Sequence, residues 1–317
     1  MRTATTLGAF ALGLAAVFTA SLGVGHAVGP VGPVGPVGAV AAAQEQGGHG
    51  GGGREGAAHG GAEPDGDQAG GADVVPQGLS ASLEGFTLRL DTPVLPAGTP
   101  TELALHVLGP DGRPVTAYTP THDRDLHLIL VRRDGSGYQH LHPERDPAGR
   151  WSVPVTLPTA GSYKVFADTA PAGRSEALTL AADLQAPGDF RPVPLPPVSR
   201  TVQVAGSAGY EVTLSGDLVA GRPSAVTLRV SRDGTPVTDL EPYLGAYGHL
   251  VSLRAGDLAY LHTHPDGAPG DGRTPAGPDV AFEVDVPTAG TYRLHLDFKH
   301  AGVVRTAEFT ATAGGTP

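Results

Sequence analysis

The sequence predicts an all-β protein built from two tandem antiparallel β-sandwiches, and three observations lead to that fold class. From about residue 79 onward, short alternating apolar and polar runs are separated by Pro, Gly and Asp. This part of the chain carries no convincing helical period of apolar residues. The pattern also restarts after a proline-rich segment, which indicates a duplicated domain.

The first 27 residues resemble a secretory signal. Arg2 precedes an apolar run of small residues from Thr6 to Val24, which ends in the small-x-Ala pattern Gly25-His26-Ala27. The run is also nearly long enough to cross a bilayer, so an uncleaved membrane anchor is the alternative. Either way, we expect the protein to be secreted or extracytoplasmic.

The rest of the chain divides by composition. Residues 28–78 are rich in Gly, Pro and Ala and cannot bury enough apolar surface to offset chain ordering, which predicts a disordered tether. The first sandwich is expected over 79–183 and the second over 199–313. Between them, the prolines of 184–198 predict a stiff extended linker.

Strand-like runs follow one another through the first sandwich and are separated by turn signals such as Pro110-Asp111-Gly112. The expected strands are Thr101–Leu108, Leu126–Arg133, Tyr138–His142, Trp151–Leu157, Tyr163–Asp168 and Ala177–Ala181.

A duplication relates the two sandwiches. Asp-Gly-x-Pro-Val begins at Asp111 and returns 122 residues later at Asp233. Pro-Thr-Ala-Gly-x-Tyr ends at Tyr163 and returns 129 residues later at Tyr292. The difference between these offsets falls in a Gly/Pro-rich loop of the second copy, where insertions are tolerated.

The repeated Pro-Thr-Ala-Gly-x-Tyr element is typical of the turn that enters a late strand of immunoglobulin-like domains. In that turn a tyrosine hydroxyl bonds nearby backbone, so Tyr163 and Tyr292 are assigned to the fold. Trp151 occurs only in the first copy and is expected in the core.

Composition excludes several function classes. A net charge of -11 without a basic stripe argues against nucleic acid and against anionic lipid surfaces, so a membrane contact is expected only through an uncleaved N-terminal segment. The absence of cysteine removes disulfides, thiol catalysis and thiolate metal sites. With methionine only at the start, histidine and carboxylate remain as ligands, and these suit Cu(II) or Zn(II).

Histidines recur at matching positions of both copies, which otherwise diverge. His127 opens one strand and His140-x-His142-Pro closes the next, and His249 and His262-x-His264-Pro repeat the arrangement. If each hairpin has a two-residue turn, Val131 faces His140 and Ile129 faces His142. The three histidines of a copy then share one face of the sheet, with His127 roughly 7 Å from His142 along the diagonal.

Each hairpin is therefore predicted to hold one metal site, formed by His127, His140 and His142 in the first copy and by His249, His262 and His264 in the second. Asp168 and Asp297 end the same late strand of each copy and are candidate carboxylate ligands.

The predicted function is an exported, non-catalytic metal-binding protein of the cell envelope. The alternative is a tandem interaction or adhesion module, in which the histidines form a buried structural network and a surface meets an envelope protein. Catalysis is not expected, because the sequence shows no acid–base partner, nucleophile elbow or phosphate loop.

The arrangement His-Leu-x-x-Val-x-x-Asp, Tyr-x-His-x-His-Pro and Pro-x-x-Gly-x-Tyr-x-x-x-x-Asp resembles actinobacterial secreted proteins related to the YtkA-like domains. These are small immunoglobulin-like modules of the bacterial envelope. The resemblance covers about residues 80–182 and 202–312. A looser similarity to copper-resistance periplasmic sandwiches implies copper handling, although the histidine- or methionine-rich segment often used there has no counterpart here.

Overall fold

The computed structural model describes residues 77–174, 176–261 and 263–315, which all fall within one compact unit. The predicted signal or anchor of residues 1–27 and nearly all of the predicted tether of 28–78 lie outside the described residues. Every regular element that is described is a β-strand. No membrane-crossing helix occurs in the part of the chain that the structure describes.

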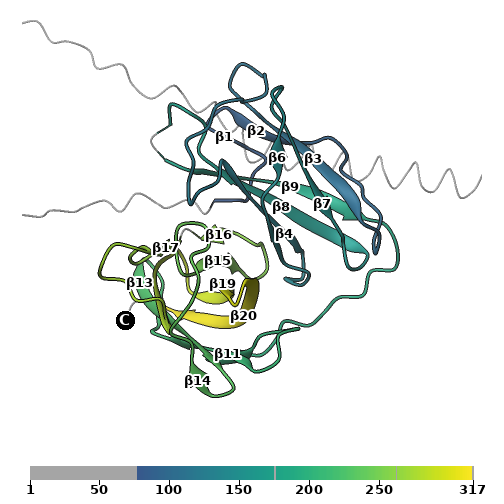
Figure 1. The fold of residues 1–317 in the computed structure, drawn as a ribbon. Helices are drawn as coiled ribbons and strands as arrows, with labels where there is room; N and C mark the ends of the chain where they lie inside the picture. The colour runs from purple at the N-terminus through teal and green to yellow at the C-terminus, as the bar shows by residue number, and fades with distance from the viewer. Residues whose placement is uncertain (1–76, 175, 262, 316–317) are drawn as a thin grey trace, which may run out of the picture. The chain divides into compact units, whose positions relative to one another are not determined.

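The first sandwich, called sandwich 1, consists of two sheets (Figure 1). One sheet has the strand order β1-β2-β3-β7-β6, with β1 (Ser82–Leu83), β2 (Phe86–Leu90), β3 (Thr101–Leu108), β7 (Arg150–Val155) and β6 (Glu144–Arg145). The other has the order β5-β4-β8-β9, with β5 (Gln139–Leu141), β4 (Leu126–Arg132), β8 (Gly161–Thr169) and β9 (Leu178–Ala186).

Sandwich 2 repeats this plan. Its first sheet has the order β10-β11-β13-β18-β17, with β10 (Thr201–Gln203), β11 (Tyr210–Ser215), β13 (Arg222–Arg232), β18 (Asp279–Val286) and β17 (Thr263–Pro265), and β14 (Thr235–Pro236) pairs with β13. Its second sheet has the order β12-β20-β19-β15-β16, with β12 (Leu218–Val219), β20 (Val303–Gly314), β19 (Gly290–His300), β15 (His249–Arg254) and β16 (Tyr260–Leu261). The predicted fold class is confirmed.

The strand alternation explains the two cores. Leu126, Leu128 and Leu130 of β4 point into sandwich 1, where Trp151 is also buried. In sandwich 2, Leu250 of β15 packs inside in the same way. Removing one such side chain from water contributes about 1.5–3 kcal/mol. The assignment of Trp151 to the core is confirmed.

The tyrosine turns are also confirmed. The hydroxyl of Tyr163 donates to the backbone oxygen of Thr159 at 2.7 Å, and that of Tyr292 donates to the backbone oxygen of Thr288 at 2.6 Å. Both rings are fully buried. Each turn therefore fixes the start of the strand that leads to Asp168 or Asp297.

The segment between the sandwiches begins later than expected, because Leu184, Gln185 and Ala186 belong to β9. Residues 187–198 carry no strand and are exposed throughout. Sandwich 2 extends to Gly314.

A third apolar cluster joins the outer faces of the two sandwiches. It contains Ile129, Val131, Phe166 and Ala181 of sandwich 1, and Val251, Leu253, Leu258 and Tyr260 of sandwich 2. An antiparallel sheet usually exposes one face to water, whereas β4 and β15 are buried on both faces. The outer faces therefore form an interface, and the histidines lie on the same strand faces.

Candidate metal centre

Five histidines gather beside the start of β4. The ring centre of His127 lies 5.4 Å from that of His140, 5.2 Å from that of His142 and 5.2 Å from that of His249. The ring centre of His122 lies 4.7 Å from that of His249. Four of these residues come from sandwich 1, and His249 comes from sandwich 2.

Three of the five form the tightest group. One ring nitrogen each of His127, His140 and His142 lies within 4.8 Å of the other two. His127 is the second residue of β4, and alternation places it on the outer face with Ile129. His140 pairs directly with Ile129 across the hairpin, so it projects to the same face.

The predicted register was wrong by two residues, because Ile129 was expected opposite His142. In the second copy, a two-residue turn at Asp257-Leu258 would place Leu253 opposite His262, whereas Leu253 pairs with Tyr260, which is the same displacement. Both connections are longer than a two-residue turn. An even displacement keeps every side chain on its predicted face, so the shared face of His127 and His140 survives the error.

The outer nitrogens of two histidines are held by fixed acceptors. The Nε2 of His127 donates to the backbone oxygen of Thr121 at 2.9 Å. The Nδ1 of His140 donates to the Oδ2 of Asp297 at 2.7 Å, and both of these side chains are 3 % exposed. Such acceptors determine the tautomer of a histidine and fix the orientation of its ring, so that its other nitrogen points in a defined direction.

The inner nitrogens of the same two residues face each other. The Nδ1 of His127 and the Nε2 of His140 are 3.1 Å apart. When the single hydrogen of each ring sits on the nitrogen that donates to the outer acceptor, both inner nitrogens present lone pairs. Two lone pairs at this distance require a proton or a metal ion between them.

A tight turn places the acceptor for His127. Thr121 and Arg124 exchange backbone hydrogen bonds, and the two residues between them, His122 and Asp123, have φ angles of 48° and 62°. Positive φ at both central positions is the type I′ turn. Histidine and aspartate tolerate this conformation better than most residues do. The turn thereby holds the Thr121 oxygen and brings His122 to the cluster.

Other buried nitrogens of the cluster have no hydrogen-bond partner. They are the Nε2 of His142 and both ring nitrogens of His249. Burial, together with a smaller contribution from nearby His140, lowers the pKa of His127 to about 4, that of His142 to about 3 and that of His249 to about 2. These rings are neutral at pH 7, which is the form that binds a metal ion.

The donor set fits a divalent transition metal. Two nitrogens bound at about 2.0–2.1 Å to one tetrahedral zinc ion lie about 3.3–3.4 Å apart, close to the spacing of His127 and His140. Imidazole suits both zinc and copper. Three histidines with an open fourth position are a known zinc arrangement.

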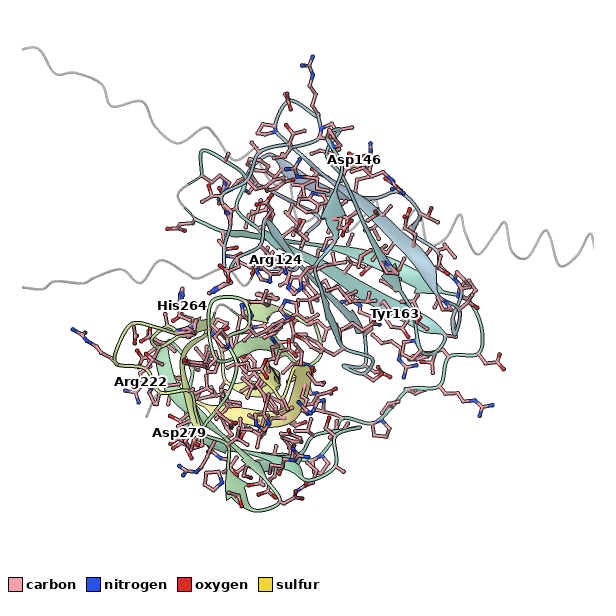
Figure 2. All side chains as sticks on the ribbon, viewed as in Figure 1. Arg124, Asp146, Tyr163, Arg222, His264 and Asp279 are labelled. Carbon is pink, nitrogen blue, oxygen red and sulfur yellow. The ribbon has the colours of Figure 1, made fainter. Side chains whose placement is uncertain are left out.

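The second copy does not repeat the group. His264 lies in β17, which pairs with β18 in the opposite sheet, and its side chain is exposed (Figure 2). In sandwich 1, by contrast, His142 precedes β6 and stays beside β4. His262 lies outside the described residues. Among the residues described, the predicted histidines therefore come together in one group that His249 flanks.

The two predicted carboxylates differ as well. Asp297 accepts from His140 through Oδ2 and from the hydroxyl of Thr306 through Oδ1. Asp168 accepts from Thr179 at 3.2 Å and from Tyr260 at 3.5 Å. Asp297 of sandwich 2 thus accepts a hydrogen bond from a histidine of sandwich 1.

Sequence comparison of the two copies missed three residues near the site. His122 and His295 have no histidine at the matching position, and Tyr138 was assigned only to a strand. The rings of Tyr138 and His295 stack with their centres 3.8 Å apart. The turn pattern Thr-His-Asp-Arg was the signal available for His122.

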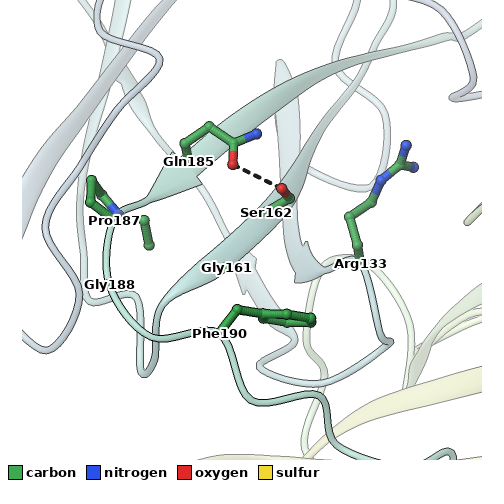
Figure 3. A pocket seen from close by; sticks show the side chains of 8 residues that line it. Arg133, Gly161, Ser162, Gln185, Pro187, Gly188 and Phe190 are labelled. Carbon is green, nitrogen blue, oxygen red and sulfur yellow. Dashed lines mark hydrogen bonds between the residues drawn. The ribbon is translucent and has the colours of Figure 1, made fainter. Parts of the chain in front are cut away.

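A separate hollow lies where the linker leaves sandwich 1 (Figure 3). It measures about 440 Å³ and is lined by Arg133, Ser162, Gln185 and Phe190 among others. None of its lining residues is a histidine or a carboxylate. It therefore offers no donor set comparable with the histidine cluster.

Comparison with known proteins identifies one family. A family model described as a domain of unknown function (DUF8832) matches residues 81–186 and 203–315, one match for each sandwich. No curated protein matches the sequence.

Several solved structures were matched to parts of this chain at low sequence identity. The Escherichia coli adhesin FdeC is 16% identical, with a TM-score of 0.23, and the match covers 74% of this chain and 65% of that one. Yersinia pseudotuberculosis InvD is 13% identical with a TM-score of 0.25, covering 74% and 59%. The surface layer protein SbsC is 13% identical with a TM-score of 0.23, covering 73% and 31%. The chain thus matches less than two thirds of each of these structures, and we draw no functional conclusion from them.

Proposed function

The chain belongs to the DUF8832 family through both of its sandwiches, and from the geometry of its histidine cluster we propose that it is a non-catalytic metal-binding protein. The site holds one Cu(II) or Zn(II) ion. His127 binds it through Nδ1, His140 through Nε2 and His142 through its buried Nε2. The apolar stretch from Thr6 to Val24 supports an extracytoplasmic location.

The observation that carries this proposal is the distance of 3.1 Å between the Nδ1 of His127 and the Nε2 of His140. The other nitrogen of each ring is held by a hydrogen bond, to the backbone oxygen of Thr121 for His127 and to Asp297 for His140. Locked tautomers of this kind are typical of histidines that bind metal ions. The unpartnered Nε2 of His142 adds a third donor. His122 and Arg124, which lie beside the cluster, are exposed.

The test is calorimetric titration of the purified protein with Zn(II) and with Cu(II). We expect one ion per chain and a micromolar or tighter dissociation constant. The variants His140→Ala and His142→Ala should weaken binding, whereas His264→Ala, which changes the matching residue of the second copy, should not. Binding no tighter than millimolar, or equal binding by all variants, contradicts the proposal.

One observation favours a second function. The buried His140–Asp297 pair links the two sandwiches, and a charged His140 sharing a proton with His127 satisfies the same contact without metal. The chain is then a tandem interaction module, whose surface meets an envelope protein. In that case Zn(II) leaves the melting temperature unchanged, whereas a bound ion must raise it.

A further inference from the structure

The histidine cluster draws on both sandwiches. His140 of β5 bonds to Asp297 of β19. The ring of His249, at the start of β15, stacks on that of His127 with an interplanar angle of 21° and lies 5.3 Å from the ring of His140. Two strands of each sandwich therefore meet at the three-histidine group.

His249 is the member of the cluster whose nitrogens remain unused. Both ring nitrogens are buried and have no hydrogen-bond partner. Leaving such a donor and acceptor unsatisfied destabilises the folded state. An ion at the neighbouring three nitrogens gives one nitrogen of His249 a partner, once rotation about the side-chain bonds turns that nitrogen toward the ion.

The interface beside the cluster is built twice from the same parts. The ring of Tyr138 stacks on His295, and that of Tyr260 packs on Phe166 at 5.7 Å. The repeat offsets of 122 and 129 relate Tyr138 to Tyr260 and Phe166 to His295. Each sandwich thus presents the same outer face to the other, as in a twofold interface.

Polar groups weaken this interface. The hydroxyl of Tyr138 and both ring nitrogens of His295 are buried without hydrogen-bond partners. An interface within one chain that contains unsatisfied polar groups is less stable than a wholly apolar one, and such interfaces permit relative motion of the domains. Apolar packing alone therefore holds the two sandwiches together weakly. An additional bond across the interface has a large effect on the stability of their association.

We propose that the metal ion fastens the two sandwiches together, with His249 as the ligand that sandwich 2 contributes. The inference rests on the proposed function and extends it. Sandwich 1 supplies three nitrogens, His249 supplies the fourth, and Asp297 positions His140 across the interface. Binding of the ion locks the two outer faces, and removal of the ion releases them.

The first experiment counts the ligands. Cu(II) bound to the full chain should show electron paramagnetic resonance splitting from four nitrogens, and in His249→Ala it should show three. Zn(II) affinity should fall at least about tenfold in His249→Ala and His249→Gln, and about 10- to 100-fold in Asp297→Asn. Circular dichroism checks that each variant folds. Four nitrogens and unchanged affinity without His249 overturn the inference.

The second experiment measures whether the metal ion restricts the motion of one sandwich relative to the other. Because the chain contains no cysteine, the substitutions T99C and T238C place one label on an exposed residue of each sandwich. Zn(II) should narrow the distribution of distances between the labels in the otherwise native chain but not in His249→Ala.

The outcomes separate the two proposals. Zn(II) binding without any change in the label distances overturns the fastening and leaves the metal site standing. Absence of Zn(II) binding by the native chain overturns both.

Discussion

The two hairpins of this protein carry the same histidine motif, yet they use it differently. In sandwich 1, β5 stays paired with β4 until Leu141, and His142 remains beside the cluster. In sandwich 2, the strand has already joined the opposite sheet at Thr263, and the side chain of His264 is exposed there. A repeated motif therefore does not imply a repeated site, because the point at which a strand changes sheet decides which way its side chains face.

The largest loss of stability should come from substitution of Asp297, the carboxylate of sandwich 2 that bonds to His140 of sandwich 1. Asp297→Ala leaves both the Nδ1 of His140 and the hydroxyl of Thr306 without their acceptor, and each such unsatisfied buried group costs about 1–3 kcal/mol. Urea unfolding measures this loss. As a control, Asp279→Ala breaks a half-exposed pair with Arg229 and should cost no more than about 1 kcal/mol. Equal losses contradict the structural role of Asp297.

Next in size is the apolar contact between the outer faces. Leu253→Ala removes a fully buried side chain from that contact and should cost about 2–5 kcal/mol. A surface leucine of a free-standing sandwich has a far smaller effect, so the same urea experiment tests whether the faces are covered in solution. A loss below about 0.5 kcal/mol shows that they are not.

His142 and His264 occupy matching positions of the two copies, so substituting each of them compares the two copies directly in metal binding. His142→Ala should weaken Zn(II) binding about 10- to 100-fold, because it removes one of the three converging nitrogens. His264→Ala should leave the affinity unchanged, since that residue is exposed on the opposite sheet. Titration calorimetry gives both values, and a similar loss in the two variants argues for two equivalent sites.

Acid should weaken the metal-free protein. His127 takes up a proton below about pH 6.5 in the unfolded chain but only below about pH 4 in the folded one. The unfolded state therefore holds more protons in that window, and stability falls as the pH is lowered through it. For His127 alone the loss from pH 7 to 5.5 is on the order of 1 kcal/mol.

Melting temperatures at the two pH values measure this loss. His127→Gln should reduce the difference between them, whereas His264→Gln should not. An equal pH dependence in all three proteins refutes the assignment to His127.

The smallest effect should be the same in both copies. Tyr163→Phe and Tyr292→Phe each remove one hydroxyl bond to the turn backbone and should cost about 0.5–1.5 kcal/mol. Melting curves of the two variants should shift alike. A marked difference indicates that the copies have diverged in their folds as well as in their sites.

The sequence was sufficient for the fold because its signals are local. Strand alternation and the repeated tyrosine element each act within about ten residues and are found where they were expected, whereas the hairpin register is displaced by two residues. The shared face of His127 and His140 was predictable for the same reason, since alternation along a strand survives an even error in register.

The remainder of the site depends on contacts between distant residues. No local pattern reveals that Asp297 reaches His140, which precedes it by 157 residues. The apolar residues Ile129, Val131, Val251 and Leu253 were visible beside the histidines, and they were the signal that both outer faces are covered. His122 lay beyond a search for shared residues, because the second copy has Leu244 in its place.

The exposed linker of residues 187–198 has a consequence for how the chain can be divided. A protease that cuts there leaves both apolar cores whole, because each sandwich is built from its own strands. The cut nevertheless places His127, His140 and His142 on one fragment and His249 and Asp297 on the other. The cluster then persists only as long as the fragments stay associated, so the smallest unit that carries it is the pair of repeats.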